Sequence, residues 1–416
     1  MRPEPLRIFL STGEVSGDVV GALLAARILE ERPETSLYGV GGSRMKAAGV
    51  SIDFDTNHLG TVGVSEAFSK LPAHWRALGR IRARVRRDRP DAAVLIGNDV
   101  FNVLLGRWLR SRGVTTISYF PPQVWIWGVF ARFISRSFDL ILSSFPEEQR
   151  LYGATPVRTI FVGHYLCNVL SPTTPEERTA VRARIGLPED ALVIGVLPGS
   201  RAHEIRSLAG ALLDAVAGLS RRRGELRVLL PLAEPLYGER IRSEIRSRGL
   251  GDRVEVLEGS HDVMRASDLL LTASGTATLE AALLGIPMVV AYRVAWLTQT
   301  VVRTAIRLGL MESETLALPN LVLGEATVPE FGQSAMRAEA IEKEAWDLVS
   351  RPERRQSMRT ALAGMRERLS QADTLGQVAR AVVAEAAAAA GRQSQVVGLF
   401  PVGAAASDPL KDGNRT

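Results

Sequence analysis

The 416-residue sequence contains one cysteine, four lysines and few aromatic residues. A single thiol, Cys167, cannot form an internal disulfide framework or a cysteine-cluster metal site, so we expect a reducing compartment. Aromatic residues make up only 6% of the chain, whereas hydrophobic residues together make up 46%. This composition is typical of an α/β protein whose core is filled by Val, Leu, Ile and Ala, and the length suffices for two or three domains.

The sequence also lacks an apolar run of about twenty residues, which argues against a transmembrane helix. The apolar run at residues 6–10 is too short for the core of a signal peptide and is expected to form the first strand. We therefore expect a cytoplasmic protein, and its contact with the inner membrane would be peripheral.

Positive charge is abundant, and nearly all of it is arginine: the formal net charge is +6. So strong a preference for arginine over lysine is typical of biased codon usage, and we predict no nucleic-acid partner. Anionic substrates or an anionic membrane surface explain the charge at least as well. The arginine-rich segment 75–89 is usually the solvated face of a helix, but beside aromatic residues it is also a candidate for binding anionic headgroups.

Strand-like and helix-like segments alternate in two series, which predicts parallel, doubly wound sheets in two Rossmann-like domains. We expect domains at residues 1–170 and 176–335, joined by a Ser-, Pro- and Thr-rich linker at 170–175. Residues 338–390 are expected to be helical and to pack back on the N-terminal domain, followed by a flexible tail at 391–416. The expected strands are 7–10, 37–40, 92–96, 115–119, 140–143, 159–162, 193–197, 228–231, 254–257, 269–272 and 287–292.

Two short loops of small residues each follow a strand-like segment and precede a helix-forming one. The first carries L-P-G-S-R at residues 197–201, and the second carries A-S-G-T-A-T-L-E at residues 273–280. At such turns the backbone N–H groups and the helix dipole favour an anion. Arg201 can hold phosphate oxygens bidentately, and Glu280 can accept hydrogen bonds from sugar hydroxyls.

Either loop alone is also explained as an ordinary strand-to-helix turn with a helix cap. Ligands of open parallel sheets bind at the carboxyl ends of the strands, so both loops are expected to border one site. An arginine in one loop and a glutamate in the other together favour a nucleotide-diphosphate ligand.

Further motifs follow one another along the chain between about residues 8 and 333. They are S-T-G-E-V-S-G-D-V-V-G at 11–21, G-V-G-G-S-R-M at 39–45, F-V-G-H at 161–164, P-M-V-V-A-Y at 287–292 and L-P-N-L at 318–321. With the two loops, this ordered set resembles the motifs of the bacterial lipid-A-disaccharide synthases. These enzymes are inverting glycosyltransferases of family 19 with the GT-B fold, in which two Rossmann-like domains border a central cleft.

The resemblance implies a reaction. UDP-2,3-diacylglucosamine would donate its sugar to the 6-hydroxyl of 2,3-diacylglucosamine 1-phosphate, giving lipid A disaccharide 1-phosphate and UDP. The resemblance implies no metal and no organic cofactor. Such chemistry needs a base for the acceptor hydroxyl, electrostatic stabilisation of the leaving diphosphate, and access to two lipid substrates.

The resemblance also implies roles for single residues in the C-terminal domain. Arg201 would neutralise the UDP diphosphate, Glu280 would hold the ribose hydroxyls, and Asn320 would lie near the diphosphate or the donor sugar. Further donors to the diphosphate would come from small residues of the two loops, namely Ser200, Ser274, Gly275 and Thr276. Asn320 after a proline is equally typical of a simple turn.

In the N-terminal domain, the resemblance implies that Glu14, Ser16 and Gly17 line the opposite side of the cleft. A structural explanation is open as well, because Ser16 and Asp18 could cap a helix that begins at residue 19. For His164 we favour a hydrogen-bonded loop position over a ligand-binding role.

The chain departs from the family in its carboxylates. The family pattern G-x-D-x-P-D-F-N corresponds here to L-I-G-N-D-V-F-N at residues 95–102. Aligned on Phe101 without gaps, the two family aspartates become Gly97 and Val100, and Asp99 is the carboxylate that remains. Asp99 is thus the candidate general base, although it could equally cap the loop.

Aromatic residues at Phe120, Trp125, Trp127, Phe130 and Phe133 could contact acyl chains or the bilayer interface, or belong to the core. Three other functions stay open: another UDP-sugar glycosyltransferase, an enzyme like UDP-N-acetylglucosamine 2-epimerase, and a non-catalytic paralogue that binds a nucleotide sugar. The family resemblance also allows a homodimer that exchanges C-terminal segments.

Overall fold

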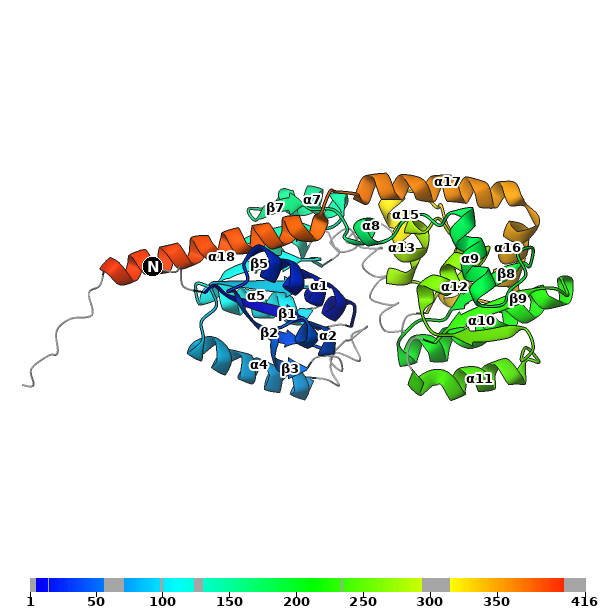
Figure 1. Cartoon of the computed structure of the whole chain (residues 1–416), viewed down its shortest axis with the longest axis horizontal. Helices are drawn as coiled ribbons and strands as arrows, with labels where there is room; N and C mark the ends of the chain where they lie inside the picture. Colours follow the sequence, from blue (N-terminus) through cyan, green and yellow to red (C-terminus); the bar gives the residue numbers. More distant parts are fainter. Residues whose placement is uncertain are drawn as a thin grey trace, which may run out of the picture.

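The computed structural model describes residues 5–13, 15–55, 71–97, 100–122, 130–232, 235–293 and 315–399. Within them, two parallel sheets lie side by side, each covered by helices (Figure 1). The predicted α/β class with two Rossmann-like domains and a helical C-terminal segment is confirmed.

The N-terminal sheet has the strand order β3-β2-β1-β4-β5-β6-β7. All of its neighbouring strands are parallel. Its strands are β1 (Arg7–Thr12), β2 (Ser36–Gly41), β3 (Ser51–Asp55), β4 (Ala92–Ile96), β5 (Thr115–Tyr119), β6 (Leu140–Ser143) and β7 (Arg158–Phe161). The central strands are buried on both faces, which is why they consist of continuous apolar residues rather than alternating ones.

The C-terminal sheet has the strand order β10-β9-β8-β11-β12-β13 and is also parallel. Its strands are β8 (Val193–Leu197), β9 (Arg227–Pro231), β10 (Val254–Leu257), β11 (Leu269–Ala273), β12 (Met288–Tyr292) and β13 (Glu330–Gly332). The strands β3 and β13 were not predicted from the sequence. Both are edge strands that are only partly buried, so neither has the apolar run by which the central strands were found.

Helices connect the strands and cover the sheets. In the first half they are α1 (Val15–Glu31), α2 (Ser43–Ala47), α4 (Leu71–Arg87), α5 (Val100–Ser111), α6 (Ala131–Ser135), α7 (Pro146–Gly153) and α8 (Leu166–Val169). In the second half they are α9 (Pro175–Arg184), α10 (Ala202–Arg222), α11 (Gly238–Ser247), α12 (Ser260–Ala266), α13 (Thr276–Leu283) and α15 (Leu318–Leu323). The 3₁₀ turns η2 (Pro235–Tyr237) and η3 (Gln333–Ala335) complete these connections.

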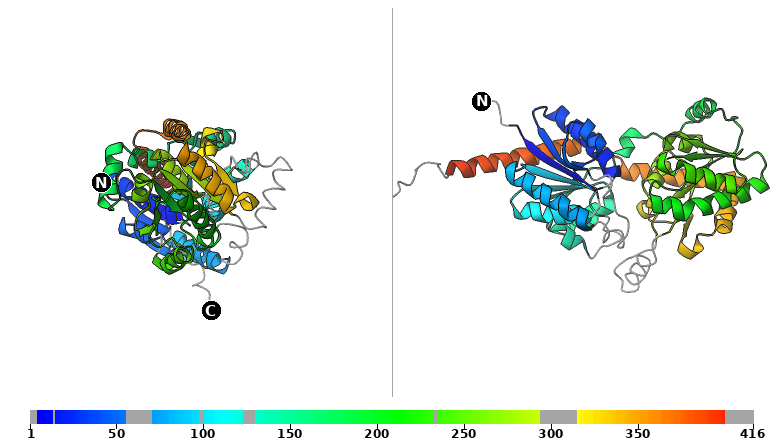
Figure 2. Two further views of the ribbon diagram at one scale, coloured as in Figure 1. Left: turned by 90° about the vertical axis from the view of Figure 1, so that its right-hand side faces the viewer. Right: turned by 90° about the horizontal axis from the view of Figure 1, so that it is seen from below.

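Three helices end the described chain: α16 (Ala338–Ser350), α17 (Pro352–Leu369) and α18 (Thr374–Leu399). We expected the helices of residues 338–390 to pack back on the N-terminal domain, and α18 lies along that domain, against α1, β4 and β5 (Figure 2). The helix α16 packs on α10, and α17 packs on α13 and α15 (Figure 1). The reason is that the buried side of α17, which includes Met358, Leu362 and Met365, completes the core of the second domain. The helix α18 also continues to Leu399, past residue 390 where we expected a flexible tail to begin.

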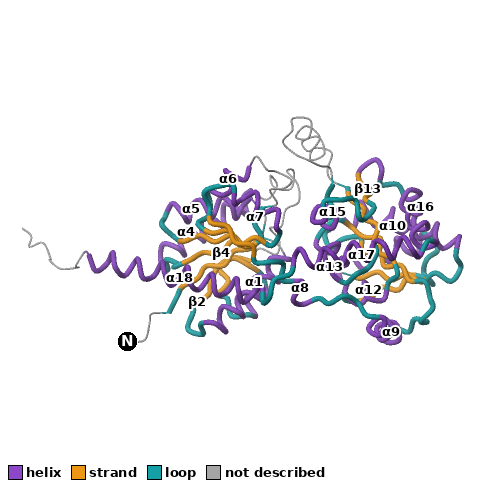
Figure 3. The backbone as a smooth tube through the Cα atoms, turned by 90° about the horizontal axis from the view of Figure 1, so that it is seen from above, coloured by secondary structure: helices purple, strands orange, loops and turns teal. Residues whose placement is uncertain are grey.

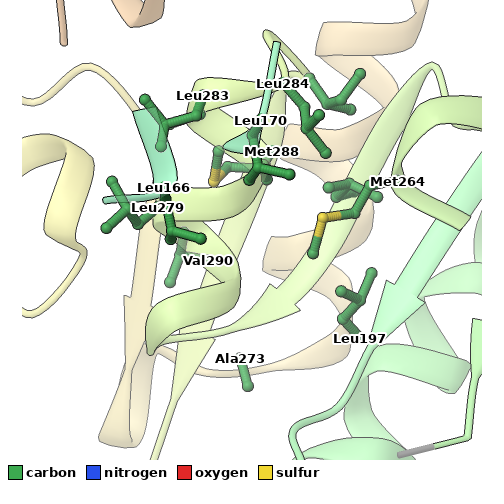
Figure 4. Close-up of a cluster of buried hydrophobic side chains, with 14 of the residues drawn as sticks. Leu166, Leu170, Leu197, Met264, Ala273, Leu279, Leu283, Leu284, Met288 and Val290 are labelled. Atoms are coloured by element: carbon green, nitrogen blue, oxygen red, sulfur yellow. The ribbon is translucent and has the colours of Figure 1, made fainter. Parts of the chain in front are cut away.

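The segment between the domains is itself part of the second domain's core. Leu166 and Leu170 pack with Leu279 and Leu283 of α13, in the same cluster as Met288 of β12 (Figure 4). Burying a leucine side chain stabilises a fold by roughly 1.5–3 kcal/mol. The helices α8 and α13 therefore lie together between the two sheets (Figure 3).

Candidate functional site

Each sheet has one point at which the chain order reverses. In the N-terminal sheet it lies between β1 and β4, and in the C-terminal sheet between β8 and β11. Such a switch point, at the carboxyl ends of the strands, is where open parallel sheets bind ligands. The loops that follow β8 and β11 are the two that the sequence singled out, so the fold places them next to each other.

Gly17 follows the loop after β1 and lies buried in the first turn of α1. A Cβ atom at this position would lie 1.8 Å from the Thr12 Oγ1 atom. Glycine is therefore required here for the close approach of α1 to the end of β1. Ser16 is exposed in the same turn, and Glu14 lies outside the described residues.

Asp18 does not cap its own helix, which begins at Val15 rather than at residue 19. Its buried carboxylate instead accepts hydrogen bonds from the backbone N–H groups of Gly42, Arg44 and Met45, at 2.7, 3.1 and 3.1 Å. These groups open α2, where the helix dipole favours a negative charge. The expected capping by Asp18 is thus corrected, because it acts on the neighbouring helix.

Met45 joins the two N-terminal motifs from the other side. A Cβ atom on Gly21 or Gly41 would lie 2.6 or 2.4 Å from the Met45 sulfur atom, so both positions leave room for this fully buried side chain. The motifs at residues 11–21 and 39–45 are therefore one packing unit.

The loop after β4 is anchored by Asn102, which the sequence analysis used for alignment without assigning it a role. Its buried side chain accepts a hydrogen bond from Ser11 Oγ at 2.8 Å and donates one to the Ile96 carbonyl at 2.9 Å. Asn102 thereby ties the ends of β1 and β4 together at the switch point. Asp99, the candidate base, lies outside the described residues; Gly97 follows the end of β4 and Val100 begins α5.

In the loop after β8, the backbone N–H groups at the helix start are bound by a carboxylate from the first turn of the following helix. Glu204 Oε2 accepts the backbone N–H groups of Ser200 and Arg201 at 3.0 and 3.2 Å, and Glu204 Oε1 lies 3.0 Å from Arg201 Nη1. Gly199 has φ +108, and a Cβ atom there would lie 2.3 Å from Glu204 Oε2. The anion position that the sequence predicted at this helix start is thus held by Glu204, while the Arg201 side chain stays 41% exposed.

The loop after β11 is different. Ser274 donates its hydroxyl hydrogen to the Leu316 carbonyl at 2.8 Å, so this side chain fixes the adjacent segment. Gly275 and Thr276 are exposed at the start of α13. Gly275 occupies the cap position, and no side chain caps the first turn of this helix within the described part of the chain.

Glu280 lies one turn further along α13 and is paired with a residue that the sequence analysis missed. Its Oε2 atom lies 3.1 Å from His261 Nε2 of α12, and this contact raises the pKa of His261 above its usual value. Burial raises the pKa of Tyr165 to about 12, and the charge of Glu280 adds to that effect. Glu280 therefore lies close to the segment that joins the domains. His261 could have been found, because it follows β10 at the same edge of the sheet.

Asn320 is buried, and its side chain makes three hydrogen bonds within its own domain. Its Nδ2 atom donates to the Val328 carbonyl and to Glu330 Oε1 at 2.8 and 2.7 Å, and its Oδ1 atom accepts from the Val328 N–H at 2.8 Å. Glu330 in turn accepts the Leu316 N–H at 3.0 Å. Asn320 is thus connected, through Glu330 and Leu316, to Ser274 in the loop after β11.

We favoured a hydrogen-bonded loop position for His164, and it lies hydrogen-bonded in the segment that joins the domains. Burial lowers its pKa to about 3, so the ring is neutral. The Nδ1 atom of its ring accepts a hydrogen bond from the Leu166 N–H at 3.3 Å, and the backbone N–H of His164 donates one to the Leu369 carbonyl at 2.9 Å. The F-V-G-H motif therefore fixes the connecting segment to the end of α17.

Arginines of α4 are partly used inside the N-terminal domain. Arg84 lies over the ring of Tyr38 and near Asp53, and Arg82 lies over the ring of Trp108. These contacts favour the structural explanation of that face of the helix. Trp125 and Trp127 lie outside the described residues, whereas Phe130 and Phe133 are exposed, with 47% and 46% of their surface accessible.

Among the residues that the structure describes, no group of three or more His, Cys, Asp or Glu side chains is placed to bind a metal ion. No helix found in the described ranges combines the length and the apolar character that crossing a membrane requires.

Comparisons with known proteins agree on one family. The model of the lipid-A-disaccharide synthetase family matches residues 8–382. The lipid-A-disaccharide synthase of Xanthomonas campestris is 36% identical over 379 residues, which cover 90% of this chain and 85% of that protein. The synthase of Pseudomonas aeruginosa is 38% identical over 339 residues, covering 81% and 87%. Among solved structures, UDP-GlcNAc 2-epimerase from Neisseria meningitidis bound to UDP-GlcNAc has a TM-score of 0.56 at 12% identity, covering 91% and 98%, and shows the fold alone. With the family model matching nearly the whole chain and two synthases above 30% identity, this chain belongs to the lipid-A-disaccharide synthase family.

Proposed function

We propose that this chain transfers the sugar of UDP-2,3-diacylglucosamine to the 6-hydroxyl of 2,3-diacylglucosamine 1-phosphate. The products are lipid A disaccharide 1-phosphate and UDP. The family match over residues 8–382 is the observation that carries the proposal. The arrangement of the loops at both switch points is consistent with it.

The donor nucleotide would bind beside the β8 and β11 loops. Glu280 would accept hydrogen bonds from the ribose hydroxyls while His261 orients its carboxylate. The exposed start of α13, with Gly275 and Thr276, would receive one phosphate, since its first turn has no side-chain cap in the described structure. Because Arg201 remains partly exposed, its guanidinium can face the diphosphate while Glu204 holds its other side.

Two of the predicted donor contacts would act indirectly. The hydroxyl of Ser274 and the amide of Asn320 are engaged within the domain, at Leu316 and at Val328 and Glu330. Their contribution would be to hold the segment from Leu316 to Asn320 against the open loop. For Ser200, the backbone N–H is bonded to Glu204, so a phosphate would have to displace that carboxylate.

The acceptor would be activated from the N-terminal domain. Asp99 follows β4 at the switch point and is the carboxylate that remains where the family pattern has two aspartates. A base at this position would take the proton of the acceptor hydroxyl as the bond to the donor sugar forms. Glu14, Ser16 and Gly17 would border the same side.

The membrane surface would be reached through α5 and α6, which lie together (Figure 3). Val100, Leu104, Phe130 and Phe133 are 73%, 52%, 47% and 46% exposed, and Arg107 lies over the ring of Phe133. Exposed apolar residues beside arginines suit the interface of an anionic bilayer. In vesicle sedimentation, Leu104→Ser with Phe133→Ser should halve the bound fraction or more, whereas Arg240→Gln, an exposed change on α11, should not.

A homodimer is part of the same proposal. The last turns of α18 extend past the N-terminal sheet (Figure 1), so they could pack against a second copy of the chain. Analytical ultracentrifugation of the full chain and of a chain ended after residue 390 would measure this. An equal mass for both at one protomer would contradict it.

The decisive assay incubates the purified protein with both acylated substrates and detects the disaccharide phosphate by mass spectrometry. Asp99→Asn should lower turnover strongly while leaving UDP binding intact. If no disaccharide forms although the folded protein binds UDP, the synthase proposal is wrong. Formation of UDP-N-acetylmannosamine from UDP-N-acetylglucosamine would instead identify an epimerase, and UDP binding without any turnover would identify a non-catalytic paralogue.

A further inference from the structure

A cavity of about 630 Å³ lies in the C-terminal domain, away from the loops at the switch points. It is bordered by the linker before α9, by α9 itself, by the end of α13 and by α17. Asp268, one of its lining residues, directly precedes β11, whereas the proposed nucleotide loop follows that strand. Five strand residues at about 3.3 Å each separate the two ends by about 17 Å.

The wall of this cavity is strongly cationic. Its charged lining residues are Arg178, Arg182, Arg359, Arg366, Asp268 and Glu189. Four arginines face two carboxylates, so two positive charges are in excess. Arg355 adds a further guanidinium behind Arg178 and Arg359.

The arginines of the wall differ in how they are compensated. Asp268 pairs with Arg178 at 2.9 Å and with Arg182 at 3.0 Å. Arg366 donates hydrogen bonds to the carbonyl oxygens of Cys167, Leu170 and Leu283, and it forms no ion pair with a carboxylate of the described chain. Arg359 is half-buried, and no ion pair or hydrogen bond joins its guanidinium to any other residue of the described chain.

Placing like charges together in a half-buried site is unfavourable unless an anion joins them. In agreement, burial and the neighbouring arginines lower the pKa values of both Arg178 and Arg359, and the Asp268 carboxylate only partly opposes this. The same guanidinium groups form bidentate hydrogen bonds to tetrahedral oxyanions. A single carboxylate would leave one charge in excess, whereas a phosphate monoester can match both.

We infer that the cavity between α9 and α17 binds a phosphate group, with Arg359 as its main unpaired cation. The group could belong to a soluble phosphorylated molecule or to the headgroup of a membrane lipid. This site is separate from the proposed nucleotide site, so either can fail without the other.

The inference is tested by calorimetric titration of the full chain with inorganic phosphate and with pyrophosphate, in the presence of saturating UDP. UDP keeps the nucleotide site occupied, so any remaining binding reports on the second site. Wild-type protein should bind, Arg359→Gln should bind at least about tenfold more weakly, and Arg359→Lys should lie between them. The matched control is Arg240→Gln, a change of the same type at an exposed arginine of α11, which should bind like wild type.

Vesicles distinguish the two sources of the phosphate. If the ligand is a headgroup, Arg359→Gln should reduce binding to phosphatidylcholine vesicles that contain phosphatidic acid, a lipid with a phosphate monoester, and not to vesicles without it. If the ligand is soluble, only the titrations should respond. Equal binding of phosphate by wild type and Arg359→Gln, or no response of wild type to either phosphate or anionic vesicles, would overturn the inference. UDP affinity should be the same in all four proteins, which also shows that they are folded.

Discussion

The two loops at the C-terminal switch point have similar sequences but differ in structure. Both connect a buried parallel strand to a helix through glycine and serine, and their strands are neighbours. In the β8–α10 loop, Glu204 binds the N–H groups of Ser200 and Arg201, so the helix start is already satisfied. In the β11–α13 loop, no side chain of the described structure caps the helix. A helix start that looks like an anion site in sequence can therefore be occupied by its own protein.

The comparison predicts that the first loop acts through its arginine rather than through its backbone. Arg201→Ala should lower kcat by a factor of about 10²–10³, as expected when one donor to a developing negative charge is lost. Arg201→Lys should recover part of this, because lysine keeps the charge but not the bidentate geometry. Steady-state kinetics would measure both, with Arg240→Ala as the control. An unchanged kcat in Arg201→Ala would exclude the role.

The glycines of the two loops provide a direct structural comparison. Gly199→Ala should lower the free energy of unfolding by about 3 kcal/mol, because it adds a clash with Glu204 to an unfavourable positive φ. Gly275→Ala should lower the free energy of unfolding by only about 1–2 kcal/mol. Its positive φ is unfavourable for alanine, but the new Cβ atom would meet no atom within 4 Å, so no clash is added. Urea denaturation of both variants would measure the difference. Equal losses of stability in the two variants would mean that Glu204 moves away easily and does not hold the N–H groups of the β8–α10 loop.

In the β11–α13 region, loss of Glu280 should have the largest effect on the affinity for UDP. Glu280→Gln should weaken UDP binding by a factor of about 10–100, which corresponds to losing a charged hydrogen bond of about 1.5–3 kcal/mol. Glu258→Gln, an exposed change before α12, is the matched control. Calorimetry with UDP and with UDP lacking the ribose hydroxyls would measure the effect. If Glu280→Gln weakens both ligands equally, Glu280 does not bind the ribose.

The smallest expected effect is the pH dependence of the His261–Glu280 pair. Glu280 raises the pKa of His261, so the folded state favours the imidazolium form. The stabilisation is complete below the unfolded pKa of about 6.5 and is lost as the pH rises through the higher folded pKa. Because the His261 side chain is 48% exposed, we expect less than about 1 kcal/mol. His261→Gln should therefore be less stable than wild type at pH 5.5 and equally stable at pH 9, and a constant difference would contradict the pairing.

The core of the fold could be predicted from the sequence because its strands are short apolar runs. The strands at residues 92–96, 115–119 and 193–197 were predicted with the bounds that they have in the structure. The edge strands β3 and β13 were missed, since their half-exposed residues resemble loops. Similarly, one local motif predicts the candidate site residues Ser274, Gly275 and Glu280, whereas the contact of Glu280 with His261 joins two helices and is not written in that motif.

The sequence by itself determined the family, the parallel α/β architecture and the positions of the loops at the strand ends. These properties follow from local composition and from motifs whose order is readable along the chain. Only the tertiary structure decided what each motif contacts: Asp18 caps α2, Glu204 occupies its own helix start, and Asn320 braces Glu330. The same holds for the arginine cavity, which is built from α9 and α17, almost two hundred residues apart. Hydrogen bonds and charge pairs act over a few ångströms in space, and the sequence does not record which distant segments folding brings within that range.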